Sequence, residues 1–366
     1  MPNNYHNQTR IMRTRHLRAL IRELPDVCAD YFVAIEQLTS PLTRLNYAYD
    51  LKLFFQYLSE ELPKFGGKSI PEFTIDDIRR VSKQDLERYA QYLTLYVKNG
   101  VNDDGTISEK EITNHEYGIK RKYASLRAFY KYLFSNGQID SNVASLVPLP
   151  KLHERAIIRL DIDEVARILD LAESGQELPK TYQKYHQVTK KRDLAILSLF
   201  LGTGIRISEC VGLNIDDFDF EQNAFVITRK GGKEVILYLS DEVADTLKDY
   251  LNERENIETL PGHEDAFFLS IQKRRITQRA VENMVKKYAA IAAPLKKKIS
   301  PHKLRSTFGT NLYRETGDIY LVADVLGHSD VNTTRKHYAA ISEDHRRIAA
   351  QKTVLREEPV HRNTPE

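Results

Sequence analysis

Two short runs of β-type residues lie on either side of a Gly-Gly pair, in a chain whose hydrophobic residues otherwise recur at helical spacing. The runs cover residues 224–228 and 235–239, and Gly231-Gly232 lies between them. A Gly-Gly pair between two such runs is typical of a β-hairpin. Because the other periodic segments indicate helices, the sequence predicts a mainly α fold with a small β-sheet.

Capping residues mark where several helices are expected to begin. Ser40 and Pro41 precede one helical pattern, and Ser82 begins another that we expect to end near Asn99-Gly100. Residues 101–116 are charged and contain glycine, which indicates an exposed loop or hairpin. Further helices are predicted over 116–136, 161–172 and 193–201, with a polar insertion before the last of them, up to residue 191.

The length of the chain bounds the number of domains. At roughly 100 to 200 residues per domain, 366 residues suggest two or three, and we expect two. Prolines and charges without a helical pattern indicate a linker after residue 150. We predict an N-terminal domain over 1–150, a linker over 151–159, a second domain over 160–340, and a C-terminal helix and tail over 341–366.

Composition argues against several classes of protein. Charged residues make up 29% of the chain, and no uncharged run approaches the roughly 20 residues of a membrane helix. Cys28 and Cys210 lie far apart without a CxxC pattern, which argues against a disulfide scaffold and against structural zinc. We therefore expect a cytoplasmic protein that does not contact a membrane.

The net charge of +3 is too small to indicate nucleic-acid binding by itself. The argument for such binding therefore depends on where the basic residues lie in the sequence. The predicted helix 116–136 has a basic face beside an apolar stripe. Such side chains can neutralise DNA phosphates, but they also occur on ordinary solvated helices. The candidate DNA-binding residues are Arg44, Lys120, Arg121, Lys122 and Arg127.

Residues 300–338 suggest a phosphate site with a nucleophile. Pro301 is expected in the first turn of a helix, so that His302 and Arg305 share one helical face. The next helix should end at Gly327, which would place the following residue, His328, in an exposed turn. Ten residues further on, the segment closes with Tyr338.

Earlier segments supply further candidates. Arg206 follows a glycine-rich turn, and the alternative to a functional role is a surface ion pair with Glu209. Lys230 and Lys233 lie at the predicted hairpin tip. Lysines at such a tip commonly serve solubility, but a mobile tip also lets one ammonium group reach a minor groove or an active site.

The sequence resembles the tyrosine recombinase (phage integrase) family across nearly its whole length. Four segments match the family motifs in the right order: Thr203-Gly204-Ile205-Arg206-Ile207-Ser208-Glu209, His302-Lys303-Leu304-Arg305, Leu326-Gly327-His328 and Tyr338. The hairpin 228–233 is most similar to Xer-type recombinases of Gram-positive bacteria. The chain departs from the common pattern at Asn142-Val143, where an Asn-Pro pair is frequent.

The resemblance implies a fold and an activity. The fold would be an N-terminal helical SAM-like core-binding domain that binds DNA, followed by an α+β tyrosine-recombinase catalytic domain. The activity would be site-specific recombination through a 3′-phosphotyrosine, with chromosome-dimer resolution as the expected role. The alternatives are an integrase or excisionase of a phage or other mobile element, a type IB topoisomerase, and a DNA-binding protein that has lost catalysis.

The resemblance also implies a role for each site residue. Arg206 and Arg305 would donate paired N–H bonds to the phosphate as negative charge builds up, and His328 would add a third donor. His302 would be the base that activates Tyr338, because a tyrosine with a reference pKa of about 10 is a weak nucleophile at neutral pH.

The remaining roles concern the leaving group and the partners. Lys230 would protonate the 5′ oxygen that leaves, with Lys233 as the alternative acid, and Glu209 would orient either Arg206 or His302. This chemistry requires no metal and no other cofactor. The expected partners are double-stranded DNA at a specific site, further copies in a homotetramer on paired sites, docked through residues 341–366, and a DNA translocase of the division machinery.

Overall fold

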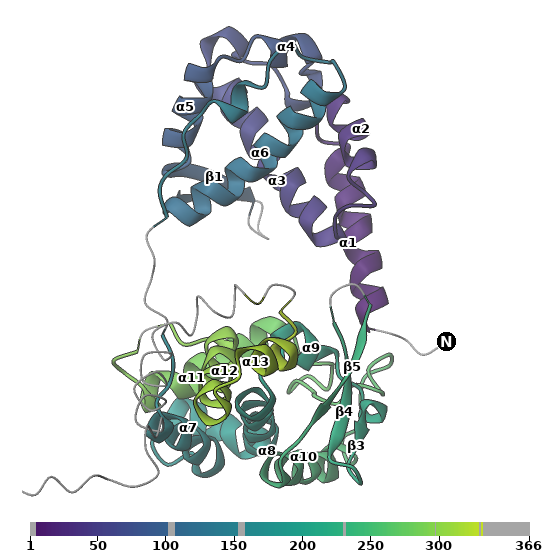
Figure 1. Ribbon diagram of the computed structural model, residues 1–366, viewed down its shortest axis with the longest axis vertical. Coiled ribbons are helices and arrows are strands. Elements are labelled where there is room, and N and C mark those ends of the chain that lie inside the picture. The colour runs from purple at the N-terminus through teal and green to yellow at the C-terminus, as the bar shows by residue number, and fades with distance from the viewer. Residues whose placement is uncertain are drawn as a thin grey trace, which may run out of the picture. The chain divides into compact units, whose positions relative to one another are not determined.

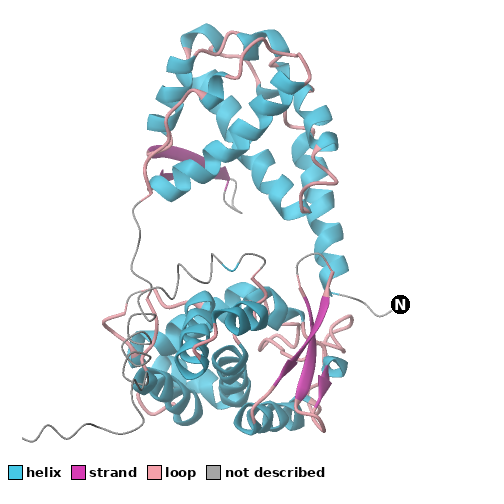
Figure 2. Ribbon diagram, viewed as in Figure 1, coloured by secondary structure: helices cyan, strands magenta, loops and turns pink. Residues whose placement is uncertain are grey.

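The computed structural model describes residues 5–101, 107–152, 158–229, 232–296, 298–328 and 331 (Figures 1 and 2). The chain divides into two compact units, residues 1–155 and 156–366. The division falls inside the segment 151–159 in which the sequence predicts a linker.

The first unit is a helical bundle with one small hairpin (Figure 2). Its elements are the helices α1 (Tyr5–Ile21), α2 (Val27–Ala34), α3 (Pro41–Glu61), α4 (Ile75–Arg79), α5 (Lys83–Tyr92) and α6 (Glu116–Ser135), the 3-10 turns Pro63–Phe65, Ile70–Glu72 and Val143–Ser145, and the strands β1 (Leu95–Val101) and β2 (Ile107–Thr113). Aromatic side chains fill the core between these helices, including Phe54 and Phe55 of α3 and Phe129 of α6, none of which is exposed.

The predicted starts of α3 and α5 are confirmed. Ser40 caps α3, because its hydroxyl accepts a hydrogen bond from the main-chain nitrogen of Thr43 at 3.1 Å. The predicted end of α5 near Asn99-Gly100 is wrong, since this helix ends at Tyr92. The residues after it form β1, which pairs antiparallel with β2. Hydrogen bonding along this ladder outweighs the helical spacing of the hydrophobic residues.

The second unit combines helices with a three-stranded antiparallel sheet. Its elements are α7 (Ile162–Ser174), α8 (Lys180–Thr203), α9 (Ile207–Gly212), the 3-10 turn Ile215–Asp217, β3 (Phe218–Asp219), β4 (Ala224–Thr228), β5 (Glu234–Tyr238), α10 (Asp241–Arg254), α11 (Gln278–Ala292), α12 (Pro301–Thr316) and α13 (Ile319–Leu326). The strand order is β3-β4-β5, and the β4–β5 pair runs from Ala224 opposite Tyr238 to Thr228 opposite Glu234. The hairpin predicted from the Gly-Gly pair is therefore confirmed.

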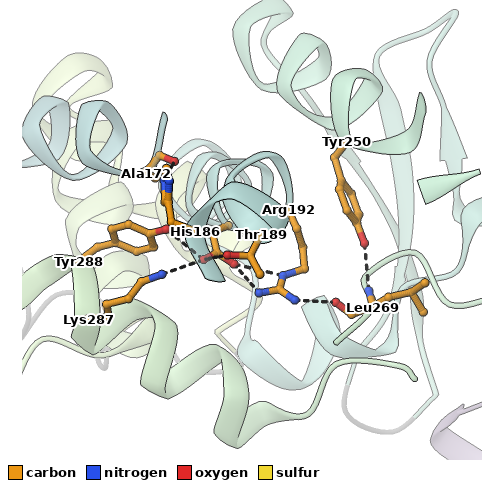
Figure 3. Close-up of polar contacts among 9 residues, drawn as sticks. Ala172, His186, Thr189, Arg192, Tyr250, Leu269, Lys287 and Tyr288 are labelled. Atoms are coloured by element: carbon orange, nitrogen blue, oxygen red, sulfur yellow. Dashed lines mark hydrogen bonds and ion pairs between the residues drawn. The ribbon is translucent and has the colours of Figure 1, made fainter. Parts of the chain in front are cut away.

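The polar insertion predicted before residue 193 is wrong, because α8 is continuous from Lys180. Its polar side chains are used inside the unit, as Figure 3 shows. Nε2 of buried His186 lies 2.9 Å from the carbonyl oxygen of Ala172 in α7, and Thr189 donates to buried Asp193 at 3.1 Å. His186 therefore joins α8 to α7, and Thr189 bonds within α8, so polarity did not mark an insertion.

Candidate active site

The turn after α13 places His328. Asp318 caps the start of the helix, and Gly327 ends it in the left-handed conformation, with φ of 61°. The main-chain nitrogens of Gly327 and His328 donate to the carbonyl oxygens of Asp324 at 2.8 Å and Ala323 at 2.9 Å. A glycine adopts this conformation without steric cost, so the predicted helix end at Gly327 is confirmed. His328 follows directly, as predicted, but it is half-buried and not exposed.

Helix α12 carries His302 and Arg305, with Pro301 as its first residue, as predicted. His302 is exposed in the first turn, whereas the Arg305 residue is only 5% exposed. Arg305 Nη1 donates to the carbonyl oxygen of Gly204 at 2.6 Å, and Nη2 donates to that of Leu326. Arg305 therefore joins the turn before α9 to the end of α13.

Gly204 lets that turn approach α12 closely. Its φ is 63°, and a Cβ atom added there would lie 2.4 Å from the ring of Phe308 and 2.9 Å from the side chain of Leu326. A side chain at this position would push the carbonyl group away from Arg305. The glycine is thus required both by its backbone conformation and by the packing of the site.

Arg206 is the N-cap residue of α9 and is fixed by Glu209. The two carboxylate oxygens of buried Glu209 accept hydrogen bonds from the main-chain nitrogen of Arg206 at 2.7 Å and from its Nη1 at 2.8 Å. Arg206 Nη2 donates to the carbonyl oxygen of Gly327 at 2.9 Å. The pair predicted between these residues exists, but its arginine also contacts the turn that carries His328.

A third guanidinium group, which was not among the predicted site residues, meets the same helix end. Arg229 follows β4, and its Nη1 and Nη2 donate to the carbonyl oxygens of Asp324 at 3.1 Å and Val325 at 2.6 Å. Burial lowers the pKa of Arg229, as does the charge of Arg206, while Glu209 opposes this shift. Its position before Lys230 was the available signal, but contacts to residues 95 and 96 positions away cannot be read from local pattern.

Carbonyl groups at the end of α13 explain why cations gather there. The last carbonyl groups of a helix lack partners within the helix and carry the negative end of its dipole. In α13 and the glycine after it, those of residues 324–327 accept from Arg229, Arg305 and Arg206. Three segments of the second unit are thereby brought to the turn that precedes His328.

The remaining predicted site residues are placed only in part. Lys230, Tyr338 and the tail 341–366 lie outside the described residues. The structure therefore does not describe how Tyr338 contacts the site. Lys233 is described and exposed, and its carbonyl oxygen accepts from the main-chain nitrogen of Arg229 at 2.8 Å. The roles of all these residues stay predictions.

Several of the candidate DNA-binding residues of the first unit have partners inside that unit. Arg121 forms two hydrogen bonds with buried Asp50, at 2.8 and 2.7 Å. Arg44 is buried and pairs with Glu36 at 2.6 Å. These contacts hold the bundle together, and DNA binding by these two arginines stays a prediction.

The other three candidates differ among themselves. Arg127 donates to the carbonyl oxygens of Ala144 at 3.2 Å and Val147 at 2.7 Å, after the end of α6. Lys120 is exposed, whereas burial lowers the pKa of half-buried Lys122. DNA binding by these three residues stays a prediction as well.

Two features are absent from the described residues, a membrane-spanning helix and a cluster of metal-binding side chains. Across these ranges, none of the helices is both long enough and apolar enough to cross a membrane. In the same part of the chain, His, Cys, Asp and Glu side chains form no group of three or more that could hold a metal ion.

Comparisons with known proteins identify the family. Residues 159–345 match the family model described as Phage integrase family. A tyrosine recombinase XerC of Caldanaerobacter subterraneus is 33% identical over 340 residues, which cover 90% of this chain and 86% of the relative. A tyrosine recombinase XerD of Oceanobacillus iheyensis is 30% identical, covering 78% of this chain and 92% of the relative.

Solved structures share the fold at lower sequence identity. The XerH recombinase bound to a palindromic difH substrate has a TM-score of 0.61 at 20% identity, covering 85% of this chain and 80% of that one. The Tn1549 transposon integrase in complex with circular intermediate DNA has a TM-score of 0.60 at 21% identity, covering 89% and 99%.

The matched residues include the arginines, the histidines and the turn described above. The chain therefore belongs to the phage integrase family. More particularly, the Xer-type resemblance and the enzyme class of tyrosine recombinase that the sequence predicts are both confirmed. The two-part fold of a helical domain followed by an α+β catalytic domain is confirmed as well.

Proposed function

We propose that this protein breaks and rejoins DNA strands at a specific site, with Tyr338 as the nucleophile. The tyrosine oxygen attacks a phosphorus atom, the bond to the 5′ oxygen breaks, and a 3′-phosphotyrosine forms. A 5′-hydroxyl from a second strand then reverses the step. The observation that carries this proposal is the meeting of Arg206 and Arg305 at the carbonyl groups beside His328.

The two arginines meet the charge that develops during this transfer. The five-coordinate phosphorus carries more negative charge than the starting phosphodiester, and a planar guanidinium group can donate two parallel N–H bonds to it. Both side chains are fixed by the protein before DNA arrives, because Glu209 and the carbonyl groups of the turn set their positions. Such pre-arranged donors cost little reorganisation when charge develops.

Proton transfer completes the proposed mechanism. His302 takes the proton of Tyr338, His328 donates a hydrogen bond to the phosphate, and Lys230 gives a proton to the departing 5′ oxygen. Lys233 is the alternative acid. These roles rest on the family resemblance together with the positions of His302 and His328 at the start of α12 and after α13.

The proposed role is chromosome-dimer resolution by a homotetramer on paired DNA sites in the cytoplasm, with a DNA translocase as partner. Support comes from the relatives named XerC and XerD, because this chain is similar to them over most of their length. The second candidate is integration of a mobile element, which the likeness of fold to the Tn1549 transposon integrase favours. Mapping covalent adducts across the host genome separates the two, because one predicts a single chromosomal site and the other predicts element ends.

Covalent capture on nicked DNA tests the nucleophile. We expect wild type to form an adduct, Tyr338→Phe to bind the same DNA without forming one, and the control Tyr320→Phe, which alters an exposed tyrosine of α13, to behave as wild type. An adduct in Tyr338→Phe would contradict the assignment. Absence of any adduct in wild type would favour a DNA-binding protein without catalysis, and relaxation of site-free DNA would favour a topoisomerase.

A further inference from the structure

Arg229 lies at the base of the β4–β5 turn and reaches a different element with its side chain. Its main-chain nitrogen donates to the carbonyl oxygen of Lys233 at 2.8 Å, and its own carbonyl oxygen accepts from Gly232 at 3.0 Å. These two bonds fix where the turn begins. The guanidinium group of the same residue binds the carbonyl oxygens of Asp324 and Val325 in α13.

The contact with the turn after α13 is close. A Cβ atom added to Gly327 would lie 2.3 Å from Nη1 and 2.5 Å from Cζ of Arg229. The guanidinium group therefore lies against the main chain of Gly327, in space that a side chain would fill. The same glycine offers its carbonyl oxygen to Arg206.

The environment of Arg229 is costly for a residue with a purely structural role. The group is partly buried, and burial lowers its pKa, as does the like charge of Arg206, whereas the charges of Glu209 and Asp324 oppose that shift. Its Nε is buried and has no hydrogen-bond partner among the described residues. A buried donor without a partner and the burial of a charged group both cost free energy, and such costs concentrate at functional sites.

We propose that Arg229 is a positioning residue that holds the base of the β4–β5 hairpin against the Gly327–His328 turn. The inference rests on the proposed function, because the residue that follows Arg229 in the sequence is Lys230, the proposed acid. With the guanidinium contacts in place, the hairpin base stays in register with the phosphate site. Without them, the hairpin base loses its bonds to the carbonyl groups of Asp324 and Val325.

The leaving group offers a readout that a structural role would not change. In the normal step, the bond between phosphorus and the 5′ oxygen breaks, and the departing oxygen takes a proton from the acid. When sulfur replaces that bridging oxygen, the P–S bond breaks and the thiolate leaves without needing a proton. A variant that displaces only the acid should therefore be slow with oxygen and nearly normal with sulfur.

The experiment measures covalent cleavage by the full chain on nicked DNA with a bridging oxygen or a bridging sulfur, together with DNA affinity. We expect Arg229→Ala to slow cleavage about 10- to 100-fold with oxygen but less than about 3-fold with sulfur, at unchanged affinity, since general acid catalysis contributes roughly 10²- to 10⁴-fold. Arg229→Lys should be intermediate, because one ammonium group does not reproduce two parallel donors.

Arg254→Ala is the matched control. This arginine also donates to two main-chain carbonyl oxygens of the second unit, those of Ala266 at 3.1 Å and Glu264 at 2.7 Å, but it does not contact α13 through these bonds. We expect it to affect both substrates equally. Equal slowing on both substrates by Arg229→Ala and Arg229→Lys, or no slowing, would overturn the inference, whereas a wild type without any adduct would overturn the proposed function itself.

Discussion

Glu209 shows how much one buried carboxylate determines at this site. It accepts from both the main chain and the side chain of Arg206, so it fixes the start of α9 and the direction of the guanidinium group together. The side chain of Glu209 is only 4% exposed, whereas that of Arg206 is 36% exposed. One partner is thus held inside the protein while the other remains accessible to a phosphate.

Glu209→Gln should therefore lower both stability and cleavage. Glutamine keeps the shape, but its amide nitrogen must face one of two N–H donors, which leaves a buried donor unpaired at a cost of about 1–3 kcal/mol. We expect the free energy of unfolding to fall by that amount and cleavage to slow by about 10-fold or more. Chemical denaturation and covalent capture measure the two effects.

Glu177→Gln is the control for that change. Glu177 pairs with Arg167 at 2.6 Å, but the two side chains are 53% and 47% exposed. An exposed pair of this kind contributes less than about 1 kcal/mol. Equal effects of the two substitutions would contradict the role given to Glu209.

At the scale of elements, α13 depends on the glycine that ends it. Gly327→Ala introduces a Cβ atom at a φ of 61° and within 2.3 Å of Arg229 Nη1. We expect displacement of Arg229, of the carbonyl group that accepts from Arg206, and of His328, and therefore a loss of cleavage of about 100-fold or more. Covalent capture at saturating DNA measures this loss.

Gly262→Ala separates backbone strain from displacement of the site. Gly262 also has a left-handed φ, of 86°, but an added Cβ atom would meet nothing within 4 Å. Only the backbone cost of about 1–2 kcal/mol is then expected, with normal cleavage. If both variants cleaved normally, the close approach at Gly327 would have no catalytic consequence.

Local signals explain which elements the sequence predicted. Pro301 and Gly327 act on their own neighbours, so the start of α12 and the end of α13 could be read without knowledge of the fold. β1 could not be predicted in this way, because its pairing with β2 decides its conformation. The first half of α8 could not be predicted either, because its polar residue His186 bonds to another helix. The contacts of Arg229 could not be predicted for the same reason, because they depend on residues far away in the sequence.

At the scale of the whole molecule, each unit has its own core, and buried Asp193 binds several polar side chains inside the second. Asp193 is 1% exposed and accepts from Arg192 at 2.7 Å, Lys287 at 3.1 Å and Tyr288 at 3.0 Å. Burial opposes its ionisation, but the charges of Arg192 and Lys287 outweigh burial and lower its pKa below the usual range. Figure 3 shows both basic side chains pointing to the same place between α8 and α11.

This lowered pKa predicts how acid affects the second unit. A carboxylate with a lower pKa in the folded state stabilises that state above its unfolded pKa of about 3.9, and the contribution is lost as pH falls through the folded value. Asp193→Asn should lower the free energy of unfolding by about 3–5 kcal/mol near neutral pH and remove part of the acid dependence below pH ~4. Unfolding curves at several pH values test this.

Because the chain has two compact units, only one unfolding transition should respond to that substitution. Asp245→Asn, which alters a side chain that is 76% exposed, should leave both transitions in place. A shift of the transition of the first unit in Asp193→Asn would contradict the separate stability of the two units.

The contacts at the end of α13 also bear on the direction of the reaction. Carbonyl groups accept hydrogen bonds from all three arginines, and the carboxylate of Glu209 also pairs with Arg206. A guanidinium group has five N–H donors, so it can keep such contacts while it binds a phosphate. We therefore expect an arriving strand to add contacts without displacing these, and a departing strand to leave the same arrangement behind. Such a site favours neither the substrate nor the recombined product, so the outcome of strand exchange must be decided by what holds the DNA partners together.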